Sequence, residues 1–261
     1  MSLTVNLNDK VALITGASSG IGRGVAIAMA QAGCHVFINY PPGEGDQNAL
    51  SVQSEIGKNG GLASLAPADV SSESEVKSMF AEILAVVGRL DILVNNAGTN
   101  LPEPFLKVKK SSLETLLNIN TKAAFNVAKL CTDKMLKLKN RKRVGGSIIH
   151  TSSMFGLVAG PNRTVYSMTK FGIEGLTKGM ALDLAKFNIR VNSVCPTFVA
   201  TPRAKKYLAN KDFNKYALSN IPLGRIATES DVATAITYLA SDASSMITGT
   251  NIIIDGGWTA K

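Results

Sequence analysis

Short apolar runs alternate with stretches of helical periodicity along almost the whole chain. The apolar runs predict buried strands at residues 11–15, 36–39, 62–65, 91–94, 147–151, 190–194 and 251–254. The periodic stretches predict helices at residues 22–32, 48–56, 113–138, 165–185 and 229–239, with a further one beginning near residue 72. Because strand and helix alternate, we expect an α/β fold, a doubly wound parallel sheet with helices on both faces.

The chain of 261 residues shows no linker, no low-complexity segment and no sequence repeat beyond this rhythm. We therefore predict a single dinucleotide-binding and catalytic domain over residues 1–261. The one long stretch without a clear period is 198–222. Insertions of this kind near the carboxyl ends of strands are often lids, so we predict a substrate loop there.

Composition narrows the class of protein. Hydrophobic residues make up 45% and charged residues 18%, which suits a packed core and excludes a disordered chain. No apolar run approaches the roughly 20 residues of a membrane span, and the start has neither a basic nor an apolar leader segment. We expect no membrane contact and a cytoplasmic location.

Cysteine and histidine are too few and too scattered for several kinds of chemistry. Cys34, Cys131 and Cys195 are odd in number and far apart, so we expect no disulfide framework. With His35 and His150 as the only histidines, neither a metal site nor a Ser-His-Asp hydrolase is indicated. Both histidines fall on or beside buried strands, where a structural role is the simpler interpretation.

The net charge of +9 raises the question of an acidic partner. The densest basic stretch lies within residues 134–143, directly after an apolar helical segment. A nucleic-acid patch and a solvated helix end both fit, but no aromatic residues interleave the charges, so we do not expect nucleic acid as a partner. A basic surface also attracts phosphorylated cofactors and anionic substrates.

The first chemical signal is the segment TGASSGIG at residues 15–22, which follows a predicted strand and opens a helix. Side chains at Gly16, Gly20 or Gly22 would block the approach of a pyrophosphate to backbone N–H groups or the packing of helix on strand. The spacing differs from G-x-G-x-x-G, and no Gly-Lys-Ser/Thr follows, which argues against ATP hydrolysis. An ordinary glycine-rich turn is the alternative.

The second signal is Tyr166 four residues before Lys170, a spacing that places both side chains on one helix face. A free tyrosine, with a pKa near 10, is a poor base, and a nearby cation lowers that pKa. Tyr207 and Lys211 have the same spacing, so the spacing alone is weak. We treat this second pair as a decoy, because it lies in the aperiodic stretch without a serine-bearing strand before it.

Two polar residues support the first pair. Ser153 follows the strand at 147–151, where its hydroxyl can donate to a substrate oxygen or cap a turn. Asn120 interrupts an apolar helical pattern, where a buried asparagine needs partners. An active-site water is one possible partner, and a structural, helix-kinking asparagine is the alternative.

Together these residues resemble the short-chain dehydrogenase/reductase family. The resemblance runs from Lys10 to Trp258 and also includes ADV at residues 68–70, NNAG at 95–98, RVN at 190–192 and DGG at 255–257. It implies a Rossmann-type sheet of about seven parallel strands and a nicotinamide dinucleotide cofactor. One departure is Pro196-Thr197, where such chains usually have Pro-Gly, so we expect a reshaped nicotinamide pocket.

The resemblance also implies roles for individual residues. Tyr166 would be the general acid/base, Lys170 would lower its pKa and bind the nicotinamide ribose, Ser153 would polarise the substrate oxygen, and Asn120 would hold a water in a proton relay. The cofactor-binding residues that it implies are Gly16, Ser18, Ser19, Gly20, Ile21, Gly22, Asn39, Tyr40, Asp69, Val70, Asn96, Ala97, Gly98, Tyr166, Lys170, Pro196, Val199 and Thr201.

The end of the second strand bears on which nicotinamide is used. A carboxylate there binds the ribose 2′-hydroxyl and disfavours a 2′-phosphate. Here Tyr40 occupies the place of that carboxylate, and none occurs before Glu44. NADP(H) is therefore favoured over NAD(H), although dual use stays open. Arg23 would assist only if its side chain reaches back to the phosphate.

The substrate is the least determined property. We expect a small-molecule carbonyl or secondary alcohol, since the chain resembles sugar and polyol dehydrogenases as well as beta-ketoacyl-acyl-carrier-protein reductases. A cofactor-sensing or nucleic-acid-binding module is the non-enzymatic alternative, but it would have no need for Asn120, Ser153, Tyr166 and Lys170 together. The two long helices carry surplus apolar surface, and the resemblance pairs them across a two-fold axis, so we predict a homotetramer.

Overall fold

A seven-stranded, wholly parallel sheet forms the centre of the computed structural model, which describes residues 5–43, 45–137 and 145–260. Each predicted apolar run forms a strand, and the observed ends differ from the predicted ones by at most a few residues. The strands are β1 (Val11–Ile14), β2 (His35–Tyr40), β3 (Leu62–Pro67), β4 (Ile92–Asn95), β5 (Gly146–Thr151), β6 (Ile189–Pro196) and β7 (Asn251–Ile254).

The strand order is β3-β2-β1-β4-β5-β6-β7. The chain runs outward from β1 to β3 and then returns to place β4 against the other side of β1. The loops that leave β1 and β4 therefore diverge, and ligands of open α/β sheets bind in the crevice at such a point. The predicted doubly wound, Rossmann-type fold is confirmed.

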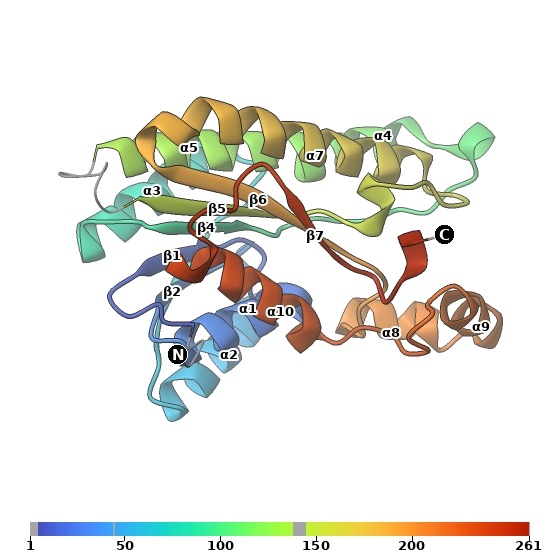
Figure 1. Ribbon diagram of the computed structural model, residues 1–261, viewed down its shortest axis with the longest axis horizontal. Coiled ribbons are helices and arrows are strands. Elements are labelled where there is room, and N and C mark those ends of the chain that lie inside the picture. The colour runs from blue at the N-terminus through green and yellow to red at the C-terminus, as the bar shows by residue number, and fades with distance from the viewer. Residues whose placement is uncertain (1–4, 44, 138–144, 261) are drawn as a thin grey trace.

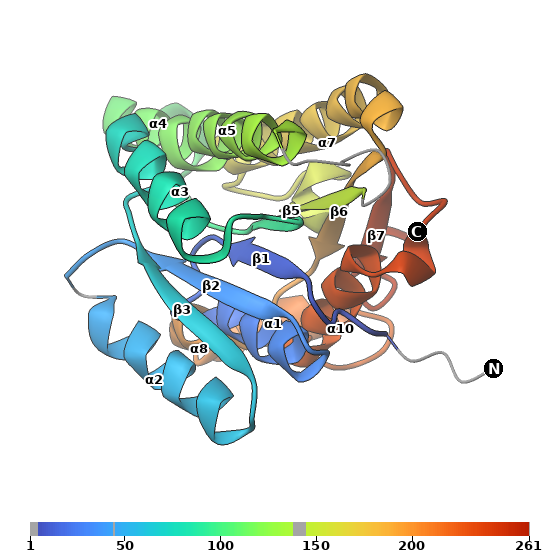
Figure 2. The same ribbon diagram turned by 90° about the vertical axis from the view of Figure 1, so that its left-hand side faces the viewer.

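Helices cover both faces of the sheet (Figures 1 and 2). One face carries α1 (Gly20–Gln31), α2 (Asp46–Lys58) and α10 (Glu229–Ala240), and the other carries α3 (Glu73–Val87), α4 (Lys110–Leu117), α5 (Ala124–Leu136) and α7 (Thr164–Leu184). Two buried cores result, and β1 feeds both, since Ala12 and Ile14 enter one and Val11 and Leu13 the other. This alternation explains why the strands are apolar without interruption.

The predicted helix at 113–138 is helical but not a single α-helix. A π-helical turn, η2 (Asn118–Ala123), separates α4 from α5, and residue 138 lies outside the described residues. Such turns are rare and are frequent at functional sites. The interruption of the apolar pattern at Asn120 falls within this turn, but an interrupted pattern does not by itself specify a π-helix.

The stretch 198–222, which shows no clear period in the sequence, is largely helical, and its role as a substrate loop stays a prediction. It contains α8 (Pro202–Leu208) and α9 (Lys211–Ser219), which are too short for periodicity to reveal. Thr201 caps α8 by accepting from Ala204 N at 3.2 Å. The two helices lie together at one end of the sheet, beyond α10 (Figure 1). Tyr207 and Lys211 therefore belong to different helices, which supports treating that pair as a decoy.

The histidines lie on strands, as their sequence context predicted. His35 belongs to β2 and His150 to β5. The three cysteines are buried. Part of the basic stretch at 134–143 lies outside the described residues. Within the described chain, no helix is both long and apolar enough to cross a membrane.

Candidate active site

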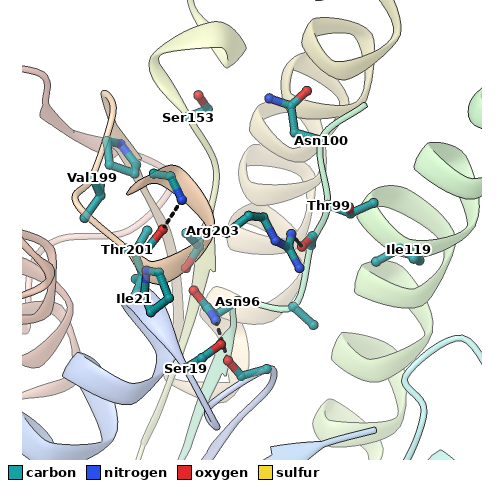
Figure 3. Close-up of a pocket in the computed structure, with 18 of the residues that line it drawn as sticks. Ser19, Ile21, Asn96, Thr99, Asn100, Ile119, Ser153, Val199, Thr201 and Arg203 are labelled. Atoms are coloured by element: carbon teal, nitrogen blue, oxygen red, sulfur yellow. Dashed lines mark hydrogen bonds between the residues drawn. The ribbon is translucent and has the colours of Figure 1, made fainter. Parts of the chain in front are cut away.

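A cavity of about 520 Å³ opens at the carboxyl ends of the strands, between the loops after β1 and β4 and the helix α8. Figure 3 shows Ser19 and Asn96 toward one end of this cavity and Ser153 toward the other. Most of the predicted site residues line it: Gly16, Ser18, Ser19, Gly20, Ile21, Asn39, Asp69, Val70, Asn96, Ala97, Gly98, Ser153, Tyr166, Lys170, Pro196, Val199 and Thr201. Gly22, Tyr40 and Asn120 are not among the lining residues.

The glycine-rich turn fits the contour of the cavity because two of its glycines have no room for a side chain. Gly16 has φ +62°, and a Cβ on it would lie 3.1 Å from Ala97 Cα. A Cβ on Gly22 would overlap the carbonyl oxygen of Gly16 and lie 2.7 Å from Asn96 Nδ2. Gly22 thus acts through packing beneath the turn rather than through contact with a ligand.

The loops after β1 and β4 are tied together by Thr15 and Asn96. Thr15 Oγ1 accepts from Asn96 N at 2.8 Å and from Ala97 N at 2.9 Å. Asn96 Nδ2 donates to Thr15 O at 2.9 Å. Sequence analysis missed Thr15, which lies just ahead of the glycines and has no exposed surface. Its hydroxyl fixes the distance between the two walls of the cavity.

The end of β2 requires a correction. β2 extends to Tyr40, whose side chain packs into the core with 5% of its surface exposed. The amide group of Asn39 is already hydrogen-bonded within the protein. Its Nδ2 donates to the Ala66 and Ala68 carbonyls, and its Oδ1 accepts from Gly16 N at 3.3 Å. Pro41 lines the cavity instead of Tyr40. β2 ends one residue later than predicted, so the position that faces the cavity after Asn39 is Pro41 and not Tyr40.

The opening of α1 is suited to an anion. α1 begins at Gly20, and no side chain caps its N-terminus, although Ser19 stands at the capping position. The first backbone N–H groups of the helix therefore face the lining formed by Ser18, Ser19, Gly20 and Ile21 without an intramolecular side-chain partner. An uncapped helix N-terminus behind glycines is a ready site for a pyrophosphate, so the residues present fit a dinucleotide.

The opposite end of the cavity holds the predicted reactive groups. Tyr166 and Lys170 lie on consecutive turns of α7, and Lys170 Nζ is 5.7 Å from the centre of the Tyr166 ring. Lys170 Nζ donates to Thr151 O at 2.8 Å. Ser153 follows β5 and accepts from Phe155 N at 3.2 Å, and its hydroxyl acts to lower the pKa of Tyr166. The structure thus brings Ser153, Tyr166 and Lys170 together.

The pKa values at this end are governed by burial. Burial lowers the pKa of Lys170 to about 8 and raises the pKa of Tyr166. The hydrogen bond with Ser153 and the charges of Arg163 and Arg203 oppose the rise at Tyr166. The expected lowering by Lys170 is not seen in the polypeptide by itself, because Lys170 directs its ammonium at the Thr151 carbonyl.

Asn120 braces the site from below. Its Oδ1 accepts from Thr99 N at 2.8 Å, and its Nδ2 donates to Thr99 O at 2.9 Å and Thr169 Oγ1 at 3.2 Å. These bonds link the π-helical turn to the loop after β4 and to α7. Asn120 is 2% exposed, and its hydrogen bonds fit a structural asparagine that holds neighbouring segments together. Its role in a proton relay stays a prediction.

Sequence analysis missed Arg163, Phe198 and Phe213, which line the cavity at the Tyr166 end. Arg203 also lines it and donates through Nη1 to Gly98 O at 3.2 Å. The sequence suggested that Arg203 meets an acidic carrier or an anionic substrate, with a solvated loop face as the alternative. Figure 3 shows Arg203 extending across the cavity from α8. Thr197, at the unusual position after Pro196, also lines it with a buried hydroxyl that has no partner. These residues come from segments whose shape no motif specifies.

Comparison with known proteins agrees with this arrangement. Residues 16–259 match the family model described as Enoyl-(Acyl carrier protein) reductase. A 3-oxoacyl-[acyl-carrier-protein] reductase of Thermotoga maritima is 38% identical over 97% of this chain and 99% of its own. A crystallised gluconate 5-dehydrogenase of Burkholderia cenocepacia, in complex with NADP and tartrate, superposes with a TM-score of 0.91 at 30% identity, over 99% of this chain and 98% of its own.

The chain therefore belongs to the short-chain dehydrogenase/reductase family, as its motifs predicted. It is an oxidoreductase of the NAD(P)-dependent dehydrogenase/reductase class. The non-enzymatic alternative is set aside by this membership. A third relative, the oxidoreductase UcpA of Salmonella typhimurium, is 38% identical over 97% of this chain and 95% of its own.

Proposed function

We propose that the protein transfers a hydride between NADP(H) and the carbonyl or secondary alcohol carbon of a small molecule of the sugar or polyol type. The observation that carries the proposal is that one cavity joins two chemically different ends. One end presents the uncapped α1 N-terminus and its glycines, and the other presents Ser153, Tyr166 and Lys170. A dinucleotide bound at the first end would extend its nicotinamide toward the second.

The chain's own residues handle the proton. In reduction, the Ser153 hydroxyl donates a hydrogen bond to the substrate oxygen while Tyr166 gives that oxygen its proton, and in oxidation Tyr166 takes the proton back. Lys170, buried beneath the tyrosine, would bind the nicotinamide ribose. The cofactor, when bound, supplies the hydride.

NADP(H) is the cofactor that the adenosine end favours. Within the described residues, the end of β2 offers the cavity no carboxylate. Tyr40 is buried in the core, and the uncharged Pro41 lines the cavity there. Arg23 does not reach back, because it pairs with Glu55 at 2.6 Å and Glu229 at 3.4 Å. The 2′-phosphate would therefore be tolerated rather than held by arginine, which leaves NAD(H) usable.

A specific observation favours a second substrate class. The exposed residues Arg203, Lys205 and Lys206 lie on α8, beside the cavity, where an acidic carrier protein would approach. The Thermotoga maritima relative is a 3-oxoacyl-[acyl-carrier-protein] reductase. A beta-ketoacyl thioester on a carrier protein is thus the alternative substrate.

A substrate panel tests both classes. Sugars, polyols, sugar acids and a beta-ketoacyl thioester are offered with NADPH, NADH and the oxidised forms, and the nicotinamide absorbance is followed. We expect turnover with at least one member, higher with the phosphorylated cofactor. Failure of every member, together with failure to bind NADPH, would contradict the proposal.

We also propose a homotetramer. The outer faces of α5 and α7 carry apolar side chains that this chain alone leaves in contact with water: Phe125, Met168, Phe171 and Leu182. Contiguous exposed apolar surface marks an interface. Light scattering at micromolar concentration tests this proposal, and a monomeric mass would refute it.

A further inference from the structure

The charges that line the cavity are unbalanced at the Tyr166 end. Three cationic side chains line the cavity, those of Arg163, Lys170 and Arg203, against one carboxylate, Asp69. Asp69 follows β3, whereas Arg163 lies after β5, and β2, β1 and β4 separate these two strands. Asp69 therefore serves the far end of the cavity, and no lining carboxylate neutralises the cations beside Tyr166.

Of the three cationic side chains, Arg163 has the weakest hydrogen bonding to the rest of the protein. It immediately precedes α7 and is partly buried. Among the described residues its buried Nε has no hydrogen-bond partner and the side chain has no ion pair, while its Nη1 makes one long bond of 3.4 Å to Asn162 O. Burial lowers the pKa of Arg163, and the nearby Tyr166, Tyr207 and Tyr216 offset this lowering only in part.

Aromatic rings surround this end of the cavity. Phe155 packs edge-on against Tyr166 at 6.4 Å between ring centres and against Phe198 at 6.3 Å. Phe198 in turn contacts Phe213 at 5.1 Å. Rings exclude water and lower the local dielectric, which strengthens the attraction between a guanidinium and an anion.

We propose that the substrate carries an anionic group, a carboxylate or a phosphate ester, that pairs with Arg163 while Ser153 and Tyr166 bind the reacting oxygen. This inference rests on the proposed function and narrows its substrate class. A guanidinium binds such groups through two parallel hydrogen bonds, and its two Nη groups form one pair of donors with that geometry. The pair would fix the distance from the anionic group to the reacting carbon, and so select which carbonyl is presented to Tyr166.

The test uses matched substrates that differ in charge. Oxo acids of four to eight carbons are compared with their primary amides, and phosphorylated hydroxyketones with the unphosphorylated ketones. The ratio kcat/KM is measured with NADPH for the wild type, Arg163→Met, Arg163→Lys and Lys58→Met. The last is the control, since Lys58 is an exposed lysine at the end of α2, outside the cavity lining. NADPH binding to each variant, followed by fluorescence, verifies that the fold is intact.

We expect the wild type to prefer the charged member of a pair by about tenfold or more. Arg163→Met should lower kcat/KM for that member by about 10- to 100-fold, the usual size of a charge-assisted hydrogen bond, and by less than about threefold for its uncharged partner. Arg163→Lys should retain part of the preference, and Lys58→Met all of it. Whether the acids or the phosphate esters respond identifies the anionic group.

Equal treatment of charged and uncharged members by the wild type, or equal losses for both in Arg163→Met, would overturn this inference. So would turnover confined to uncharged ketones, although hydride transfer would then stand. A protein that binds no NADPH and turns over nothing would fail at the proposed function itself. The two failures are therefore distinguishable.

Discussion

The two ends of the cavity are built in different ways. The dinucleotide end is formed by backbone, with glycines that admit no side chain and with Thr15 and Asn96 bonded across the gap. The nicotinamide and substrate end is formed by side chains, with Tyr166 and Arg163 among aromatic rings. The shape of the first end is fixed by the backbone, which suits the pyrophosphate of a dinucleotide, a group that is the same whatever the substrate. The second can change its specificity by substitution without disturbing the first.

Tyr166→Phe should give the largest difference between an effect on turnover and an effect on cofactor binding. Loss of the proton donor should lower turnover by about 10²- to 10⁴-fold, the usual contribution of general acid–base catalysis, while NADPH affinity changes little. Turnover and cofactor titration measure the two ends independently. Tyr207→Phe, on α8, is the comparison and should lower turnover less than about tenfold. Near-normal turnover in Tyr166→Phe would remove the assignment of Tyr166.

Lys170→Met should show how much the buried charge of Lys170 lowers the free energy of unfolding. The pKa of Lys170 is lowered from 10.5 to about 8, so below pH 8 a buried charge is carried at a cost of up to about 3 kcal/mol. Removing the charge should raise the free energy of unfolding at pH 7 by about 1–3 kcal/mol while turnover falls. The lysine is neutral in both states above pH 10.5, so the gain should shrink as pH rises from 8 to 10.5.

Urea denaturation at pH 7 and at pH 10 measures this effect, with Lys58→Met as the control for an exposed lysine. A gain in stability that is independent of pH would show that packing, and not charge, is responsible.

Gly22→Ala should damage the dinucleotide end instead. The new methyl group would overlap the Gly16 carbonyl oxygen, so the turn must shift, at about 1–3 kcal/mol of the free energy of unfolding. NADPH affinity should fall because the shift displaces Gly16. Thermal unfolding and cofactor titration record both effects. Gly172→Ala is the matched control, since a Cβ there meets nothing within 4 Å. Unchanged affinity in Gly22→Ala would show that the turn adapts.

Pro41→Asp should give the smallest effect and refine the cofactor preference. A carboxylate facing the adenosine end would repel a 2′-phosphate and accept a bond from a ribose hydroxyl. Like charges about 4 Å apart repel by roughly 4 kcal/mol at an effective dielectric near 20, and a third of that is about tenfold in affinity. NADPH should bind about tenfold more weakly and NADH no worse. An unchanged affinity ratio would show that another residue contacts the 2′ position.

Much of the candidate site was predictable because its parts are local in the sequence. A turn that admits a pyrophosphate needs glycines, as at 15–22, and the spacing of four residues places Tyr166 and Lys170 one turn apart on a helix. Tyr40 was misplaced because the inward or outward direction of a side chain alternates along a strand. An error of one residue in where β2 ends therefore exchanges core for cavity.

Phe198 and Phe213 could not be predicted as neighbours of Tyr166. They come from the loop after β6 and from α9, and packing alone brings them there. Arg163 lies only three residues before Tyr166, so its nearness is local, but its place in the cavity lining was not predicted. Short helices such as α8 carry too few residues for a periodic signal. Asn120 interrupts the apolar pattern within the turn Asn118–Ala123, but an interruption does not specify a π-helix.

The sequence by itself determined the sheet, its longer helices, the glycine-rich turn and the placement of Tyr166 and Lys170 on one helix face. Each depends on contacts between residues close in the chain or on an apolar period that burial imposes. Only the tertiary structure decided that Pro41 rather than Tyr40 faces the cavity, that Asn120 joins neighbouring segments, and that Arg163 lines the cavity with no ion pair among the described residues. Those facts depend on contacts between side chains that are far apart in the sequence. The spacing of residues along the chain does not specify the free energy of these contacts.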